Sequence, residues 1–284
     1  MSAGPTIFDK SLLRARQRRA LAMGAETFLL DRVAGELVER LSAVLRQFDR
    51  AADIGTPTDV VQRALAGKAG SIEHVEIAED EIVRLPEASL NLAVSALALQ
   101  FVNDLPGVLV QVRRALKPDG LFLAALIGGD SLTELRQSFA QAESEIEGGL
   151  SPRVAPFADL RDLGALLQRA GFALPVVDSE RLTVRYDTVF NLMHDLRRMG
   201  AANALTERRR TPLRRATLLR MAEIYAERFA DADKRLRATF EIVWLSGWAP
   251  DPSQQQPLKP GSARTRLADA LNTKELPAGE KPRP

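Results

Sequence analysis

"LPEASLNLAVSALALQFVNDLPGVLVQVRRALKPDGLFLAALIGG", residues 85–129, contains two apolar runs on either side of an amphipathic segment. Residues 90–97 are apolar at nearly every position, which is typical of a strand buried on both faces. Residues 105–117 carry apolar side chains at helical spacing and end at a Pro-Asp-Gly turn, and residues 121–129 form the second apolar run. This order predicts two parallel strands joined by a right-handed helical crossover.

The same alternation continues on both sides of this segment. On the N-terminal side, the apolar spacing predicts helices over 8–47, a strand at 51–55, a helix at 58–66 and a strand near 72–77. On the C-terminal side it predicts, in order, a helix at 130–146, a helix within 158–172, one or two strands within 173–186, helices near 188–200 and 212–230, and a last strand at 237–248. We therefore expect an α/β fold built on a largely parallel sheet.

Changes of composition along the chain suggest three parts. We expect an N-terminal helical cap over residues 1–48 and a sheet domain over 49–250, with a helical insertion at about 188–232. Residues 251–284 are rich in proline, glutamine and lysine, which predicts a largely disordered tail with one short helix at 263–271.

The composition excludes several classes of site. The chain has no cysteine and only His74 and His194, which excludes disulfides and thiol nucleophiles and argues against a histidine-rich metal site. No apolar run reaches the roughly 18 residues of a membrane-spanning helix, and the basic N-terminus lacks an apolar signal core. We expect a cytoplasmic protein with no metal site, and we expect no nucleic-acid partner.

Positive charge gathers in two stretches although the net charge is only +2. Residues 1–20 carry five cations against one acid, and residues 205–220 carry six arginines against one acid. Solvated helix faces are one interpretation, and a docking surface for an acidic partner is the other. The candidate partner-binding residues are Arg208, Arg209, Arg210, Arg214 and Arg215.

The first predicted strand ends in "DIGTPT", residues 53–58. In nucleotide-binding α/β folds, glycines at this point let the backbone approach a cofactor. Gly55 suits that role, whereas Pro57 cannot donate a hydrogen bond. From these residues alone, a cofactor loop and an ordinary strand-to-helix turn both remain open.

Longer motifs connect the chain to a known family. Residues 85–129 resemble the stretch from the fourth to the fifth strand of class I S-adenosylmethionine (SAM)-dependent methyltransferases. The segments 102–136, 151–178, 206–229 and 240–263 resemble one subgroup, the bacterial relatives of the mitochondrial complex I assembly factor described as an arginine hydroxylase. The malonyl-ACP O-methyltransferases are more distant cousins. The resemblance covers about residues 7–270 and implies a Rossmann-like sheet with flanking helices.

The resemblance also implies site residues and a cofactor, SAM. It assigns SAM contacts to Asp53, Gly55 and Thr56 of the first loop, to Ser95 at the end of a later strand, and to an acid after the second strand, for which we choose Asp80 from the cluster Glu76, Glu79, Asp80 and Glu81. Gln100-Phe101 stands where the subgroup tends to carry His-Trp, so Gln100 is the candidate for orienting a substrate.

One part of the family pattern is short in this chain. Only 38 positions separate Asp53 from Asn91, so we expect one βα unit to be reduced. Three functions stay open. The first is a SAM-dependent methyltransferase with an unknown acceptor. The second is an arginine-hydroxylase-like protein or assembly factor that acts on respiratory complex I. The third is a non-catalytic member that has lost SAM binding.

Overall fold

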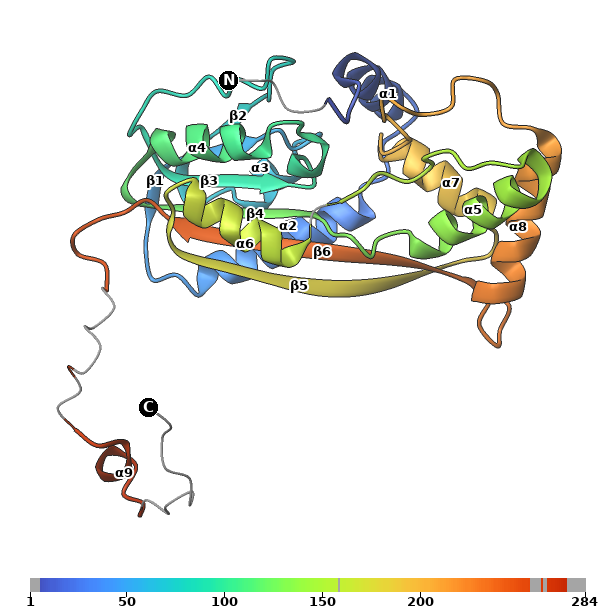
Figure 1. The fold of residues 1–284 in the computed structure, drawn as a ribbon. Helices are drawn as coiled ribbons and strands as arrows, with labels where there is room; N and C mark the ends of the chain where they lie inside the picture. The colour runs from blue at the N-terminus through green and yellow to red at the C-terminus, as the bar shows by residue number, and fades with distance from the viewer. Residues whose placement is uncertain (1–5, 158, 256–261, 263–264, 275–284) are drawn as a thin grey trace. The chain divides into compact units, whose positions relative to one another are not determined.

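The computed structural model describes residues 6–157, 159–255, 262 and 265–274 (Figure 1). The chain divides into two compact units, Met1–Asp251 and Pro252–Pro284. The second unit contains a short helix, α9 (Leu267–Ala270), inside the range predicted for a helix. Much of the predicted disordered tail, at 256–261, 263–264 and 275–284, lies outside the described residues.

The first unit is built on a six-stranded sheet with the order β2-β1-β3-β4-β6-β5. The first four strands in this order are parallel, whereas β6 lies antiparallel between β4 and β5. The strands are β1 (Phe48–Ile54), β2 (Ala69–Val75), β3 (Leu90–Ala96), β4 (Leu116–Ile127), β5 (Ala173–Tyr186) and β6 (Leu236–Trp248). The alternating α/β order predicted from the sequence is therefore confirmed.

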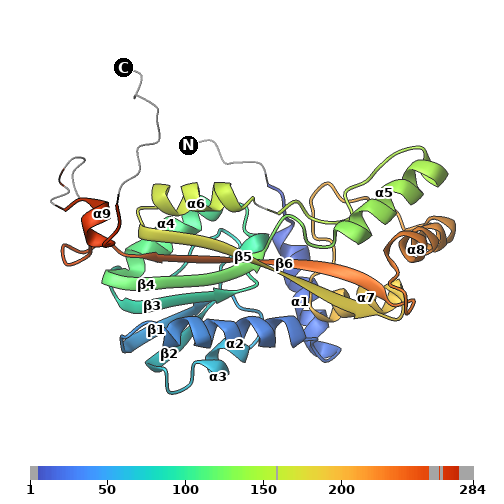
Figure 2. The same cartoon turned by 90° about the horizontal axis from the view of Figure 1, so that it is seen from below.

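Helices cover both faces of this sheet, each over its own apolar cluster. Figures 1 and 2 show α4 and α6 on one face and α2 and α3 on the other, while α5, α7 and α8 gather around the far ends of β5 and β6. The helices of this unit are α1 (Lys10–Ala22), α2 (Phe28–Ser42), α3 (Val60–Ala64), the 3₁₀ turn η1 (Leu99–Phe101), α4 (Leu105–Ala115), α5 (Thr133–Glu147), α6 (Leu160–Arg169), α7 (Val189–Arg198) and α8 (Arg215–Phe229).

Local sequence explains the element ends that carry the site. Six of the seven residues of β3 are buried, as the apolar run at 90–97 predicted. Asp104 caps α4 by accepting a hydrogen bond from the Gly107 N–H, and a proline lies in the first helical turn. The chain therefore passes from β3 through η1 into α4, and α1 contacts the segments that follow β2 and β3 through Arg14 and Lys10.

The segment between β2 and β3 is reduced, as the spacing predicted. Residues 76–89, all described, form neither a helix nor a strand, so β2 is an edge strand. The predicted helical stretch 8–47 is interrupted at 23–27, which separates α1 from α2.

Candidate functional site

The carboxyl ends of β1 and β3 are joined by buried side chains. Asp53, Thr56 and Ser95 are all 0–1% exposed. The Thr56 hydroxyl donates to the Asp53 carboxylate and accepts from the Ala96 N–H at 3.1 Å, while the Ser95 hydroxyl donates to the Ile54 carbonyl at 2.7 Å. These contacts fix the loop after β1 against β3.

Gly55 is required by the shape of this loop. Its φ of +74° lies in the left-handed region, and its N–H donates to the Val75 carbonyl at 2.9 Å. A Cβ atom here would lie 3.0 Å from Ile77 Cδ1 and 3.2 Å from Ala98 Cβ. A larger residue would therefore strain the backbone and displace its neighbours.

A cavity of about 560 Å³, the strand-end cavity, opens beside this loop. Its floor comes from the ends of β1 and β2, and α1 forms the opposite wall. The lining includes Lys10, Arg14, Gln17, Arg18, Leu21, Gly55, Thr56, Pro57, His74, Glu76, Ile77, Glu79 and Phe101. Asp53 and Ser95 do not line it and act from behind the loop.

The four acids after β2 have different roles. Glu76 is the first residue after the strand; it lines the strand-end cavity, and its side chain makes no ion pair or hydrogen bond with any described residue. Asp80, the acid chosen from the sequence, lies outside the cavity lining, where it accepts from the Ile82 N–H and pairs with Arg84. Glu79 pairs with Arg14 of α1 at 3.1 Å.

Glu81 is a structural anchor for α1. It is 8% exposed and accepts from Lys10 Nζ at 2.8 Å and from the N–H groups of Asn103 and Asp104 at 2.7 and 2.6 Å. Burial alone would raise the pKa of this carboxyl, but these hydrogen bonds outweigh burial, so the pKa is lowered. α1 is thus held across the carboxyl ends of the strands.

His74 contributes the remaining polar group of the cavity floor. Its Nδ1 lies 3.4 Å from Asp53 Oδ2. Burial raises the pKa of Asp53, although hydrogen bonds from Thr56 and His74 and the charge of His74 oppose this change.

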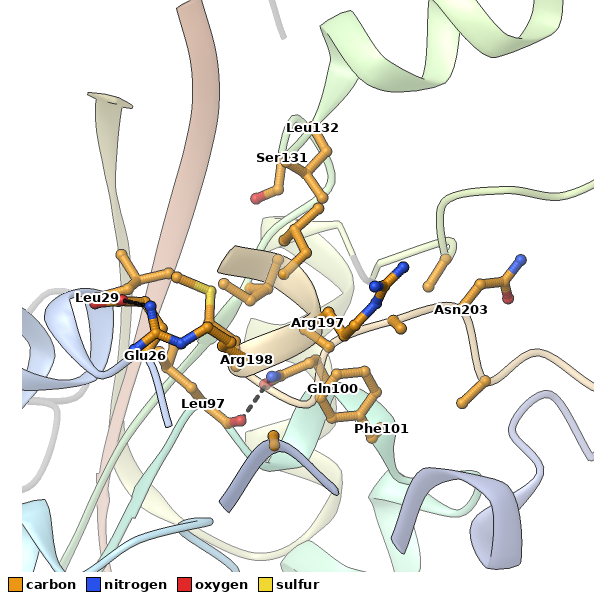
Figure 3. Close-up of a pocket in the computed structure, with 18 of the residues that line it drawn as sticks. Glu26, Leu29, Leu97, Gln100, Phe101, Ser131, Leu132, Arg197, Arg198 and Asn203 are labelled. Atoms are coloured by element: carbon orange, nitrogen blue, oxygen red, sulfur yellow. Dashed lines mark hydrogen bonds and ion pairs between the residues drawn. The ribbon is translucent and has the colours of Figure 1, made fainter. Parts of the chain in front are cut away.

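A second cavity, of about 300 Å³, adjoins the first and is mainly apolar (Figure 3). We call it the apolar cavity. Its walls come from the end of β3, the start of α5, the end of α7 and the loop at 153–157. The two cavities share the side chains of Gln17, Leu21, Pro57 and Phe101.

Gln100 lies on the wall of the apolar cavity, as Figure 3 shows. Its Nε2 donates to the Leu97 carbonyl at 2.7 Å, and its Oε1 is buried without a hydrogen-bond partner among the described residues. Arg198, which also lines this cavity, pairs with Glu26 at 3.0 Å.

The five arginines predicted to bind a partner fall into two groups. Arg208 pairs with Asp9 at 3.3 Å, and Arg209 pairs with Glu147, so both are engaged inside the molecule. Arg210, Arg214 and Arg215 are exposed and make no ion pair with any described residue. Only these three are therefore available to a partner without breaking an internal contact.

Two kinds of feature are absent from the described residues. No group of three or more histidine, aspartate or glutamate side chains is arranged there to hold a metal ion. None of the helices in the described part of the chain is long and apolar enough to cross a membrane.

Comparison with known proteins gives consistent matches. Residues 25–175 match the family described as "Methyltransferase domain". The chain is 37% identical to the arginine-hydroxylase NDUFAF5, mitochondrial, of Rattus norvegicus, over 93% of this chain and 83% of that protein. With the Dictyostelium discoideum protein of the same name it shares 44% identity over 69% of this chain, a match that spans 45% of that protein.

Two further matches extend this picture. The malonyl-[acyl-carrier protein] O-methyltransferase of Gallionella capsiferriformans is 31% identical over 87% of this chain and 93% of its own length. The crystal structure of the YcgJ protein from Bacillus subtilis has a similar fold, with a TM-score of 0.51 and 13% identity over 77% of this chain and 98% of that one. The relationships and the Rossmann-like fold predicted from the sequence are confirmed.

Proposed function

Because the chain belongs to the SAM-dependent methyltransferase family, whose cofactor is SAM, we propose that the strand-end cavity holds SAM and that the apolar cavity holds the methyl acceptor. The wall shared by the two cavities carries this proposal. Methyl transfer requires the acceptor atom to lie in line with the sulfonium, so the two molecules must occupy adjoining spaces. Phe101 and Pro57 lie at that junction.

The residues on the cavity floor suit the parts of SAM. Gly55 and Thr56 present a tightly held loop to the amino acid part, and the uncommitted carboxylate of Glu76 is available to the ribose hydroxyls. Asp53 and Ser95 support this loop from behind. We propose Glu76 in place of Asp80, because Asp80 lies outside the lining.

SAM supplies an electrophilic methyl group, and the protein's part is to position the acceptor. The apolar walls limit the access of water, and the unpartnered Oε1 of Gln100 is available to an N–H or O–H group of the acceptor. An acceptor held by one hydrogen bond in an apolar space is restricted in orientation, which accelerates an in-line transfer.

Calorimetric titration with SAM and S-adenosylhomocysteine tests this proposal. We expect Gly55→Val to weaken binding by more than about tenfold, because left-handed backbone costs a side chain about 1–2 kcal/mol and the new methyl groups press on Ile77. Gly149→Val is the matched control, since a Cβ at Gly149 meets nothing within 4 Å. Glu76→Gln should weaken binding roughly tenfold, and Glu87→Gln should not.

The opposite result is equally informative. If the folded wild-type protein binds neither compound at millimolar concentration, the proposal fails and the chain is a member of the family that has lost its cofactor. The packing of Ile77 against Gly55 would then be read as closure of the site.

The relatives named as arginine hydroxylases motivate a second proposal. The chain would act on, or assist the assembly of, a subunit of respiratory complex I, and the exposed Arg210, Arg214 and Arg215 would contact an acidic surface of that subunit. Mass spectrometry of a purified complex I subunit after incubation distinguishes the two reactions, because methylation adds CH₂ and hydroxylation adds one oxygen. A cytoplasmic location belongs to the same proposal.

A further inference from the structure

Asp53 and His74 form a polar contact between neighbouring strands behind the strand-end cavity. The two residues are register partners in β1 and β2, and His74 Nδ1 lies 3.4 Å from Asp53 Oδ2. Asp53 is fully buried, whereas the side chain of His74 is 34% exposed and lines the cavity. The imidazole therefore contacts a buried carboxylate through Nδ1 and also forms part of the cavity lining.

This contact determines which ring nitrogen carries the proton. When the Asp53 carboxylate is ionised it only accepts hydrogen bonds, so the ring nitrogen that faces it is then the donor. In the neutral ring the proton then sits on Nδ1, and Nε2 is left as an acceptor. Nε2 lies across the ring from Nδ1, so it is the ring nitrogen left for a ligand in the cavity that His74 lines.

The free acceptors on the cavity wall lie in two places. Ser11 and Gln17 of α1 line the wall opposite the strand ends, and neither side chain makes a hydrogen bond with a described residue. Lys10 and Arg14 of α1 are donors and are engaged by Glu81 and Glu79. Glu76 follows His74 by two positions, at the end of the same strand, and is uncommitted. Two free acceptors at one strand end suit a ligand with two neighbouring hydroxyl groups.

We propose that His74 accepts a hydrogen bond through Nε2 from a ribose hydroxyl of SAM, beside Glu76, and that Asp53 holds the imidazole in its Nδ1–H form. The proposal rests on the proposed function, in which SAM occupies the strand-end cavity. His74 is then a cofactor-binding residue, and Asp53 is its positioning residue. This contact gives the buried Asp53 a second role, in addition to its support of the loop after β1 through Thr56.

The tautomer is measured first, on the full chain without ligand. The protein contains only two histidines, so ¹⁵N NMR spectra of the imidazole rings are simple, and His194→Gln assigns the remaining signals to His74. We expect a protonated Nδ1 and an unprotonated Nε2 at slightly alkaline pH. A proton on Nε2 would overturn the proposal.

Binding of S-adenosylhomocysteine, which keeps the ribose, is measured next. The amide of His74→Asn can replace Nδ1 toward Asp53 but leaves nothing in place of Nε2, so we expect affinity to fall roughly three- to tenfold with little change in melting temperature. His74→Gln, whose amide reaches farther, should lose less. His194→Gln, an exposed position on α7, is the control.

Deoxy analogues of S-adenosylhomocysteine separate a hydroxyl contact from a general effect. An analogue that lacks the 2′- or the 3′-hydroxyl should bind the wild type more weakly than S-adenosylhomocysteine does. For the hydroxyl that contacts His74, the His74→Asn variant should bind the analogue and S-adenosylhomocysteine equally well. If wild type and His74→Asn bind S-adenosylhomocysteine equally, or neither analogue shows coupling, this proposal fails while the proposed function stands. If the wild type does not bind at all, the proposed function itself fails.

Discussion

Glu81→Gln is the substitution that best tests how α1 is held over the site. The carboxylate of Glu81 accepts from Lys10 Nζ and from the N–H groups of Asn103 and Asp104, at 2.6–2.8 Å. Glutamine keeps one oxygen and replaces the other with an NH₂ donor. One backbone N–H therefore loses its acceptor, and the ion pair with Lys10 disappears.

The expected cost is about 2–3 kcal/mol of unfolding free energy. Breaking a buried ion pair costs about 3–5 kcal/mol, and the lower value applies because the Lys10 and Glu81 side chains remain 16% and 9% exposed. A lost hydrogen bond to a charged group alone accounts for about 1.5–3 kcal/mol. Urea unfolding at neutral pH measures the difference directly.

The cost should also depend on pH. Because the pKa of Glu81 is lower in the folded chain than in the unfolded chain, its stabilisation is complete above the usual glutamate range. It is lost as the pH falls through the lowered pKa, so wild type and Glu81→Gln should converge in acid. Glu79→Gln is the control: its partner Arg14 is 38% exposed, so we expect less than about 1 kcal/mol. Equal costs for the two variants would refute the assignment of Glu81 as the anchor of α1.

Two further variants probe other parts of the molecule. Burial raises the pKa of Asp53, so the wild type loses stability as the pH rises from the usual aspartate range through that raised pKa. Asp53→Asn should therefore gain stability relative to the wild type over that pH range. Unfolding free energies from urea that depend on pH in parallel for the two proteins would contradict this. Glu147 is engaged by Arg209 and, at 2.6 Å, by the Thr217 hydroxyl. Glu147→Gln should cost about 1–2 kcal/mol and speed tryptic cleavage after Arg208–Arg210, and unchanged cleavage would show that these contacts do not hold the segment.

The elements that could be predicted from sequence are those whose signals are local. The apolar run of β3 and the capped start of α4 each depend on neighbouring residues, whereas the turn predicted at Pro118-Asp119-Gly120 is wrong, because β4 already begins at Leu116. The short spacing between Asp53 and Asn91 likewise predicted a reduced βα unit. The segment contains too few residues to build two complete βα units, and the structure has one strand, β2, within it.

The strand boundary beside the acids after β2 differs from the predicted one. The sequence pattern predicted a strand near 72–77, which has Glu76 inside the strand and Glu79, Asp80 and Glu81 after it. The strand ends at Val75, so Glu76 is the first residue beyond it and faces the cavity. Strand ends are the least certain part of a sequence-based assignment, and the difference of two residues places Glu76 directly after the strand.

Features made by distant segments could not be predicted at all. The apolar cavity is built from residues near positions 8, 97–101, 131–139 and 193–204. The two basic stretches, far apart in sequence, also meet: Arg16 has a lowered pKa chiefly because it is partly buried, and the positive charge of Arg208 contributes. No periodicity in the sequence encodes such proximity.

The charge of Asp53 is the detail that connects these observations. An asparagine at this position could accept the Thr56 hydroxyl and contact His74 equally well, and it would avoid the cost of burying a carboxylate. Unlike an ionised carboxylate, the asparagine amide donates hydrogen bonds as well as accepting them. The asparagine amide could donate to Nδ1 and so place the imidazole proton on Nε2, turning an acceptor into a donor at the cavity wall. The tautomer proposed for His74 therefore gives a reason for an aspartate rather than an asparagine at this buried position, and this is why that tautomer is measured before any ligand is added.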